Sequence, residues 1–236
     1  MNFVIPAWDV ASVPVADSDR RFPVRHIYCV GRNYAEHAKE MGGDALREPP
    51  FFFTKPADAV VPVLPPTTGT VHFPLASKNY QHEIELVVAI GRSGVRLAPE
   101  SALDVVWGYA VGLDMTRRDL QIDMREKKRP WDIGKSFAEA APIGPIHPVA
   151  AVGHPAKGRI WLDVNGATRQ DGDLADLIWD VPHTLAFLSQ YYELLPGDLV
   201  FTGTPSGVAA VFPGDHLDGG VEGLGTLSVV IAPPRA

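Results

Sequence analysis

Short apolar runs that end at a glycine or a proline limit the fold of this chain more than any other feature. Residues 26–30 and 85–90 are examples, and 22 glycines and 22 prolines separate such runs along the sequence. Segments of this length between turn-forming residues are typical of β-strands, whereas helices need longer periodic stretches. The sequence therefore predicts a β-rich α+β fold.

Helical periodicity is confined to three places. It follows Asn33, covers residues 99–103, and recurs over residues 174–195. Pro182 is expected to divide the last stretch, because a proline inside a helix removes a backbone donor, although the first helical turn tolerates it. Helices are thus predicted to be few and short.

The length of 236 residues is enough for one substantial hydrophobic core and does not require two. Residues 1–20 include Pro6 and Pro14 and show little periodicity. We therefore expect an extended N-terminal arm over residues 1–20 and a single metal-dependent catalytic domain over residues 21–236.

The acidic residues are spread along the chain, and the formal net charge is −7. This balance argues against binding to nucleic acid or to an anionic membrane, and it leaves small molecules as the expected partners. No apolar run approaches the roughly 18 residues of a membrane span. Residues 1–30 contain acids and prolines where a signal peptide needs an unbroken apolar core, so a cytoplasmic protein is expected.

The single cysteine, Cys29, cannot form an internal disulfide. It lies in an apolar run directly before the glycine at position 31. We expect a small core residue here rather than a nucleophile.

Glutamates alternate with apolar residues in the segment His82-Glu-Ile-Glu-Leu86. On a strand, this spacing places Glu83 and Glu85 on one face and the isoleucine and leucine on the other. Asp114 ends the apolar stretch 105–113, which is expected to be a buried strand. Neighbouring carboxylates repel one another, and a divalent cation relieves that repulsion. Carboxylates without histidine or cysteine favour Mg²⁺ or Mn²⁺.

The Glu-x-Glu spacing alone fits a solvent-facing strand equally well. Asp114 favours the metal site, because residues 116–121 directly after it form a dense polar cluster of the kind that functional loops carry. No compensating charge is evident beside the three acids in the sequence. Loss of one carboxylate is therefore expected to raise the stability of the metal-free protein.

His37 and Glu40 lie three residues apart in a segment that is expected to be a short helix. Asn33 fits its N-cap, and Glu36 completes a capping-box spacing. The two side chains would share a face, so the carboxylate could orient the imidazole as a general base for water. The alternative, which spacing alone favours, is an ordinary exposed His–Glu pair.

Two further segments could take part in a reaction. Lys135 lies among apolar residues in the segment 131–137, and an inward-facing ammonium would offset the charge of an enolate. Residues 202–205 follow a predicted strand, and their backbone N–H groups could receive a carboxylate or an oxyanion. An exposed lysine and a tight β-turn are the respective alternatives.

Several ordered motifs resemble those of the fumarylacetoacetate hydrolase superfamily, and together they span nearly the whole chain after the arm. They are the segments 31–40, 53–56, 82–86, 108–121, 134–137, 142–145, 165–170, 196–198 and 202–205. The resemblance implies a mixed β-roll with a few short helices, often found as a homodimer. It implies that Glu83, Glu85 and Asp114 bind Mg²⁺ or Mn²⁺, and that His37 and Glu40 form a catalytic dyad. The substrate contacts that it implies are Lys55, Arg118, Gln121, Lys135 and Thr204.

The resemblance further implies a hydrolase that cleaves a carbon–carbon bond in an acylpyruvate, a 2-oxo acid. Fumarylpyruvate is the expected substrate, giving fumarate and pyruvate. Arg32 or the charged run 125–129 could meet a distal carboxylate, although charge runs are usually solvated loops. The alternatives are decarboxylation of oxaloacetate or isomerisation of a 2-oxo dicarboxylic acid at the same site. Outside the enzymes, a metal-stabilised binding module would need the three acids but not the dyad.

Overall fold

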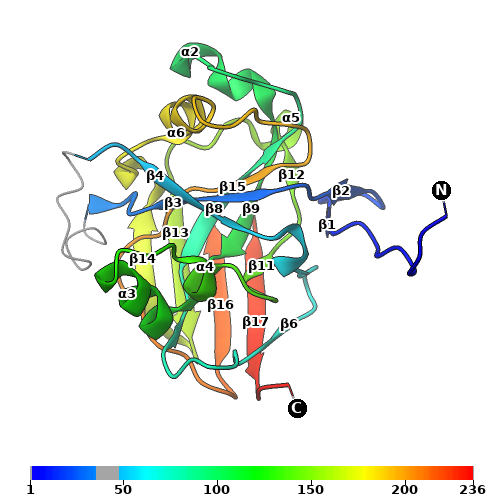
Figure 1. Cartoon of the computed structure of the whole chain (residues 1–236). Coiled ribbons are helices and arrows are strands. Elements are labelled where there is room, and N and C mark those ends of the chain that lie inside the picture. Colours follow the sequence, from blue (N-terminus) through cyan, green and yellow to red (C-terminus); the bar gives the residue numbers. More distant parts are fainter. Residues whose placement is uncertain (1, 36–47, 236) are drawn as a thin grey trace.

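The computed structural model describes residues 2–35 and 48–235, and in this part of the chain two mixed β-sheets form the body of the protein (Figure 1). The larger sheet has the strand order β4-β3-β15-β8-β9-β11-β5, and β12 also pairs with β9. Its strands are β3 (Ile27–Gly31), β4 (Phe51–Lys55), β5 (Val60–Pro62), β8 (Ile84–Ile90), β9 (Val106–Leu113), β11 (Ala141–Ile143), β12 (His147–Pro148) and β15 (Leu199–Phe201). Two of its pairings are parallel, β3 with β15 and β5 with β11, so strands that are distant in sequence become neighbours.

The smaller sheet has the order β14-β13-β16-β17-β6. Its strands are β6 (Gly69–His72), β13 (Arg159–Val164), β14 (Ala167–Asp173), β16 (His216–Val221) and β17 (Thr226–Ala232). The two sheets pack against each other at β8, where a Cβ on Gly219 would lie only 3.0 Å from the Ile84 side chain. Ile84 therefore faces the second sheet. Because side chains alternate along a strand, Glu85 faces the opposite side.

Two short antiparallel ribbons complete the described strands. They are β1 (Ser12–Pro14) with β2 (Arg21–Pro23), and β7 (Tyr80–Gln81) with β10 (Thr116–Arg117). The first ribbon carries Val13 and Val15 into the hydrophobic core. Residues 2–11 contain no strand, and Figure 1 shows this part of the arm extending away from the body. The division of the chain at residue 20 stays a prediction.

The described helices are short, and Figure 1 shows them outside the two sheets. They are α2 (Pro99–Ala102), α3 (Arg118–Glu126), α4 (Asp132–Lys135), α5 (Val149–Val152) and α6 (Val181–Leu188), with 3-10 turns η1 (Ala57–Ala59), η2 (Leu103–Val105) and η3 (Leu174–Asp176). The β-rich α+β prediction is confirmed, with the mixed sheets expected of a β-roll. None of the helices in the described ranges is long and apolar enough to cross a membrane.

Two helix predictions need correction. The helix expected over residues 174–195 is limited to α6, where Asp180 caps the first turn by accepting a hydrogen bond from the His183 N–H at 2.9 Å. Pro182 lies in that first turn, where its missing donor costs nothing, so it helps to start the helix rather than dividing it. The polar cluster 116–121 was expected to lie on a loop, but residues 118–126 form α3, with Arg118 and Gln121 buried.

Cys29 is completely buried in the middle of β3, in agreement with the expected core residue. Burial is the main cause that raises the pKa of its thiol well above the usual value, so the reactive thiolate is suppressed. Cys29→Ala is therefore expected to retain most of the turnover of the wild type in steady-state assays. Loss of activity in a variant that still unfolds cooperatively on heating would instead support a mechanism in which the Cys29 thiol takes part.

Candidate metal centre and active site

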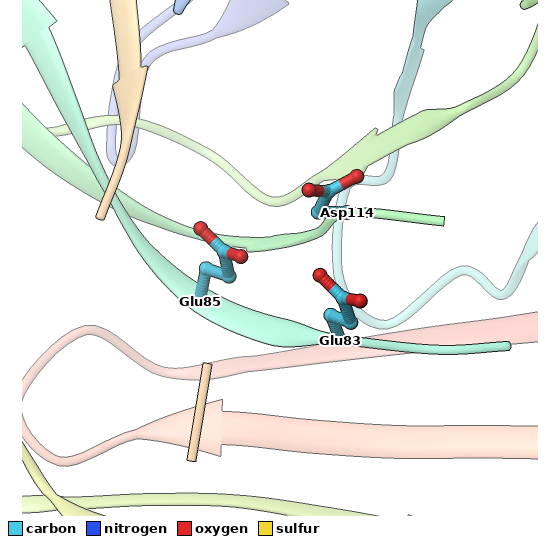
Figure 2. Close-up of side chains that lie close together, drawn as sticks. All are labelled: Glu83, Glu85 and Asp114. Atoms are coloured by element: carbon cyan, nitrogen blue, oxygen red, sulfur yellow. The ribbon is translucent and has the colours of Figure 1, made fainter. Parts of the chain in front are cut away.

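Three buried carboxylates meet where β8 and β9 lie side by side. Glu83 precedes β8, Glu85 is its second residue, and Asp114 directly follows β9. The antiparallel pairing of these strands closes with a hydrogen bond from the Asp114 N–H to the Glu83 carbonyl at 2.8 Å. One carboxylate oxygen from each acid lies within 4.8 Å of the others, and Figure 2 shows the three groups turned toward a common point. The predicted convergence of these three acids is therefore present in the structure.

Lys135 stands between two of the carboxylates. Its Nζ lies 2.8 Å from Glu83 Oε2, 2.8 Å from Asp114 Oδ2 and 2.7 Å from the Thr116 hydroxyl. The lysine is the last residue of α4, and it is 2% exposed. The alternative of a solvent-exposed lysine is thus excluded, and its ammonium lies at the centre of the site with its three donors engaged by Glu83, Asp114 and Thr116.

Lys55 holds Asp114 from the other side. Its Nζ lies 2.8 Å from Asp114 Oδ1, and it donates to the backbone carbonyls of Met115 at 3.1 Å and Lys135 at 2.6 Å. The ion pair and the two hydrogen bonds direct this ammonium toward groups of the protein itself. They fit a role in orienting Asp114 better than the predicted contact with substrate.

Arg118 and Gln121 come from the first turn of α3 and lie on the same face, because residues three apart on a helix are neighbours. The Arg118 guanidinium forms a short charged hydrogen bond with Glu83 Oε1. It also donates to Gln121 Oε1 at 2.5 Å and to Gln81 Oε1 at 2.6 Å. Both predicted contact residues therefore reach the carboxylate cluster, and their helix is the element that sequence reasoning missed.

Glu83 and Asp114 both pair with buried cations, which changes the expectation about stability. Lys135 contacts both acids, Arg118 contacts Glu83, and Lys55 contacts Asp114. Removing Glu83 or Asp114 would leave buried cations without a charged partner, and breaking a buried pair in this way commonly costs about 3–5 kcal/mol. Loss of Glu83 or Asp114 is thus expected to destabilise the metal-free protein rather than to stabilise it.

The local environment changes the proton affinity of two groups in the cluster. Burial, followed by repulsion from Asp114 and Glu83, raises the pKa of Glu85 well above its usual value. The opposing hydrogen bond comes from the Gly203 N–H, which donates to Glu85 Oε2 at 2.7 Å. Burial by itself lowers the pKa of Lys135, but attraction to Asp114 and Glu83 outweighs it, so the net shift is upward. Lys135 therefore carries its positive charge at neutral pH.

In the loop 202–205, the Gly203 N–H donates to the carboxylate of Glu85, so this predicted donor binds a group of the protein itself. Gly203 has φ +101°, and a Cβ there would lie 2.6 Å from the Asn33 Cβ, so only glycine brings this amide to Glu85. Asn33 is buried and donates from Nδ2 to the Thr202 carbonyl at 2.7 Å and to the Trp179 carbonyl at 2.8 Å. These contacts tie three chain segments together. The capping-box partner predicted for Asn33, Glu36, lies outside the described residues.

A buried polar network supports the site from behind. Gln170 Oε1 accepts from the Ile84 N–H at 3.1 Å and lies 2.8 Å from His82 Nδ1, while its Nε2 donates to the Thr204 hydroxyl at 2.7 Å. The Thr204 hydroxyl in turn donates to the Ile84 carbonyl at 2.7 Å. His82 and Gln170 were not among the predicted site residues, because no spacing in the sequence links positions so far apart. The network fixes Thr204 and the start of β8 relative to each other.

These residues line one narrow pocket, and most of the predicted side chains meet there. Glu83, Glu85, Arg118, Gln121, Lys135 and Thr204 contribute to its wall, together with Arg32 and the aromatic rings of Phe53 and Trp131. His37 and Glu40 lie outside the described residues, so their predicted dyad stays a prediction. The pocket nevertheless gathers the acidic, cationic and amide groups that the motifs singled out.

The donor set fits a hard divalent cation. In residues 2–35 and 48–235, the cluster that could hold a metal ion consists of three buried carboxylates without histidine or cysteine. Oxygen donors of this kind suit Mg²⁺ or Mn²⁺ better than zinc. The residues that would hold the ion are Glu83, Glu85 and Asp114.

A β-rich fold in which central strands deliver buried acids and short helices deliver cations to one site is typical of an enzyme, because such perturbed groups cluster at active sites. A model of the fumarylacetoacetate (FAA) hydrolase C-terminal family matches residues 26–232. The chain belongs to this family.

Three relatives show how close the similarity is. A fumarylpyruvate hydrolase of Ralstonia sp. is 45% identical over 190 residues, which cover 80% of this chain and 96% of the relative. The mitochondrial oxaloacetate tautomerase of Rattus norvegicus is 40% identical over 200 residues, covering 85% and 88%. The crystal structure of fumarylpyruvate hydrolase from Pseudomonas aeruginosa in complex with Mn²⁺ and pyruvate has a TM-score of 0.97 at 55% identity, covering 98% and 100%.

Proposed function

We propose that this protein is a metal-dependent hydrolase of an acylpyruvate, and that it converts fumarylpyruvate to fumarate and pyruvate. The observation that carries the proposal is the pocket in which three carboxylates, Lys135 and Arg118 converge, on a fold that matches a fumarylpyruvate hydrolase with a TM-score of 0.97. That related structure holds Mn²⁺ and pyruvate. Pyruvate is the product expected from the 2-oxo acid half of the substrate.

Glu83, Glu85 and Asp114 are proposed to hold Mg²⁺ or Mn²⁺. When bound, such an ion acts as a Lewis acid toward the oxygens of a 2-oxo acid and offsets negative charge on the leaving group. Lys55 keeps Asp114 in position through the 2.8 Å ion pair. The Gly203 N–H keeps Glu85 in position through the 2.7 Å hydrogen bond.

The remaining residues divide the hydrolytic step between them. His37, oriented by Glu40, takes a proton from water as the water oxygen bonds to C4 of the acylpyruvate. The C3–C4 bond then breaks, its electron pair passes to the pyruvate half, and the proton taken from water is delivered to C3, which becomes the methyl carbon of pyruvate. The Lys135 ammonium lies in the pocket where that negative charge develops, and loss of one such donor commonly costs about 10² to 10³ in rate. Arg118, Gln121 and Thr204 are proposed to orient the 2-oxo acid.

Tautomerisation, decarboxylation or isomerisation of a 2-oxo dicarboxylic acid is the second candidate function. The 40% identical rat tautomerase favours it, because oxaloacetate also passes through an enol form. Only the hydrolase needs water aimed at C4. A His37→Ala variant that loses hydrolysis and keeps oxaloacetate chemistry would show that one pocket serves both reactions.

A panel of acylpyruvates, followed by the loss of enol absorbance with and without chelator, tests the proposed function. We expect turnover that depends on Mg²⁺ or Mn²⁺ and that gives one equivalent of pyruvate per substrate. Steady turnover would exclude a non-catalytic binding module. Absence of hydrolysis with every acylpyruvate, in protein that binds the metal, would reject the hydrolase.

We propose that this reaction serves the catabolism of aromatic compounds and that it takes place in the cytoplasm. We also propose that the enzyme is a homodimer. The N-terminal arm supports the homodimer, because it exposes five large apolar side chains that its own domain leaves uncovered: Phe3, Val4, Ile5, Trp8 and Val10. Light scattering is expected to give about twice the 25.5 kDa of the chain. A single-chain mass at micromolar concentration would reject the dimer.

A further inference from the structure

The proposed reaction leaves one part of the substrate without a partner, namely the carboxylate at the far end of a fumaryl tail. Two of the cations that line the described pocket, Lys135 and Arg118, already pair with Glu83. Lys55 pairs with Asp114. A second substrate carboxylate would therefore need a different positive charge.

Arg32 supplies a cation of this kind at the wall of the same pocket. Its Nε is buried and makes no hydrogen bond in the described part of the chain. The acid that pairs with it is Glu48, whose Oε2 lies 3.9 Å from Arg32 Nη1 and whose side chain is 62% exposed. A pair this long and this exposed contributes little, so it would give way to a ligand carboxylate.

The backbone and the neighbouring ring hold Arg32 in place. Its φ of +56° lies in the left-handed region, which a long side chain adopts only when the surroundings compensate the strain. The next residue, Asn33, is anchored by its buried hydrogen bonds to two other segments. The Arg32 guanidinium lies 5.7 Å from the centre of the Phe51 ring, a cation–π contact that orients its plane.

Phe51 also belongs to a larger cleft beside the pocket. This cleft has a volume of about 470 Å³, and it shares Phe53, Trp131 and Lys135 with the pocket. The Trp131 ring centre lies 5.3 Å from that of Phe51 and 5.9 Å from that of Phe53. A wall of three aromatic rings suits a flat, unsaturated chain better than a polar one.

We propose that Arg32 is the residue that selects for acylpyruvates whose tail ends in a carboxylate, with Phe51, Phe53 and Trp131 forming the apolar wall of the tail subsite. This inference rests on the proposed function and names the substrate class within it. The other candidate from the sequence, the charged run 125–129, contributes no residue to the pocket or the cleft. Lys127, Lys128 and Arg129 are exposed instead.

The test compares two acylpyruvates of equal tail length, one ending in a carboxylate and one in a methyl group. In the wild type, kcat/KM is expected to favour the carboxylate by about 10- to 100-fold, the size of one charge-assisted hydrogen-bonded pair. Arg32→Gln is expected to bring this ratio close to one. Arg32→Lys, which keeps the charge but loses the planar fork, should lie between them. The matched control Arg129→Gln should keep the wild-type ratio.

A binding measurement separates tail recognition from catalysis. Calorimetric titration with fumarate is expected to show about 10-fold weaker binding to Arg32→Gln than to the wild type, with unchanged binding of Mn²⁺. A wild type that hydrolyses both substrates equally well would overturn the role of Arg32 while the proposed function stands. An equal loss on both substrates in folded Arg32→Gln would also overturn it. Failure of the wild type on every acylpyruvate would instead reject the proposed function.

Discussion

Removal of the divalent metal with excess chelator is expected to abolish hydrolysis of acylpyruvates, and Mg²⁺ or Mn²⁺ is expected to restore it. The reason lies in the pocket, where Glu83, Glu85 and Asp114 offer three buried oxygen ligands within 4.8 Å of one another. Lys135 and Arg118 can balance the charge of these acids, but neither can act as a Lewis acid toward a 2-oxo group. The measurement is the initial rate of enol loss, with the metal content determined by elemental analysis.

A single variant extends this prediction to stability. Asp114→Asn should weaken metal binding strongly and should also lower the free energy of unfolding of the metal-free protein, because Lys55 and Lys135 each lose a charged partner at 2.8 Å. Asp171→Asn is a matched control, because Asp171 pairs with Arg159 on the exposed surface. It should leave both quantities nearly unchanged. Full turnover in protein shown to be free of metal would contradict the metal assignment.

Loss of His37 or Glu40, the predicted catalytic dyad, is also expected to lower the rate of acylpyruvate hydrolysis strongly. His37→Ala and Glu40→Gln should each lower kcat by about 10² to 10⁴, the usual contribution of a general base. The double variant should lose little more than the worse single variant, because residues that act as a unit are not additive. Single-turnover and steady-state rates at saturating substrate provide the measurement.

Metal binding and a second histidine serve as controls for this prediction. Affinity for Mn²⁺ should change little in the dyad variants, because the proposed ligands lie in or directly beside β8 and β9 rather than in the segment around His37. His183→Ala removes an exposed histidine that lies 2.6 Å from Asp180 with the same spacing of three residues. It should keep wild-type kcat. If His37→Ala behaved in the same way as His183→Ala, the dyad would be an ordinary exposed pair.

The second sheet explains why one part of the site was predictable from sequence. Glu83 and Glu85 lie on one side of β8 and Ile84 on the other, because strand side chains alternate and the apolar face must meet Gly219 and its sheet. Asp114 follows from the same reasoning, since a buried strand can present a charge only at its end. Local periodicity is sufficient for these three positions.

The helices show where such reasoning fails. The polar cluster 116–121 suggested a loop, yet residues 118–126 form α3, and the buried Arg118 and Gln121 find partners in the carboxylate pocket. Most residues of this segment are good helix formers, so the error came from treating polarity as a sign of a loop. Pro182 was expected to divide a helix, but it lies in the first turn of α6. Its position within the helix depends on the N-cap, Asp180, which sets where α6 begins.

The sequence by itself determined the β-rich class, the three acids and the family motifs, because each of these depends on residues that are close along the chain. Only the tertiary structure decided which cations neutralise the acids, that Lys55 supports Asp114, and that Arg32 faces the pocket. It alone brought Gly203 to Glu85, because β15 lies between β3 and β8 in the larger sheet. The physical reason is that such contacts follow from strand order and packing, which join positions from 21 to 118 residues apart and leave no periodic signal in the sequence.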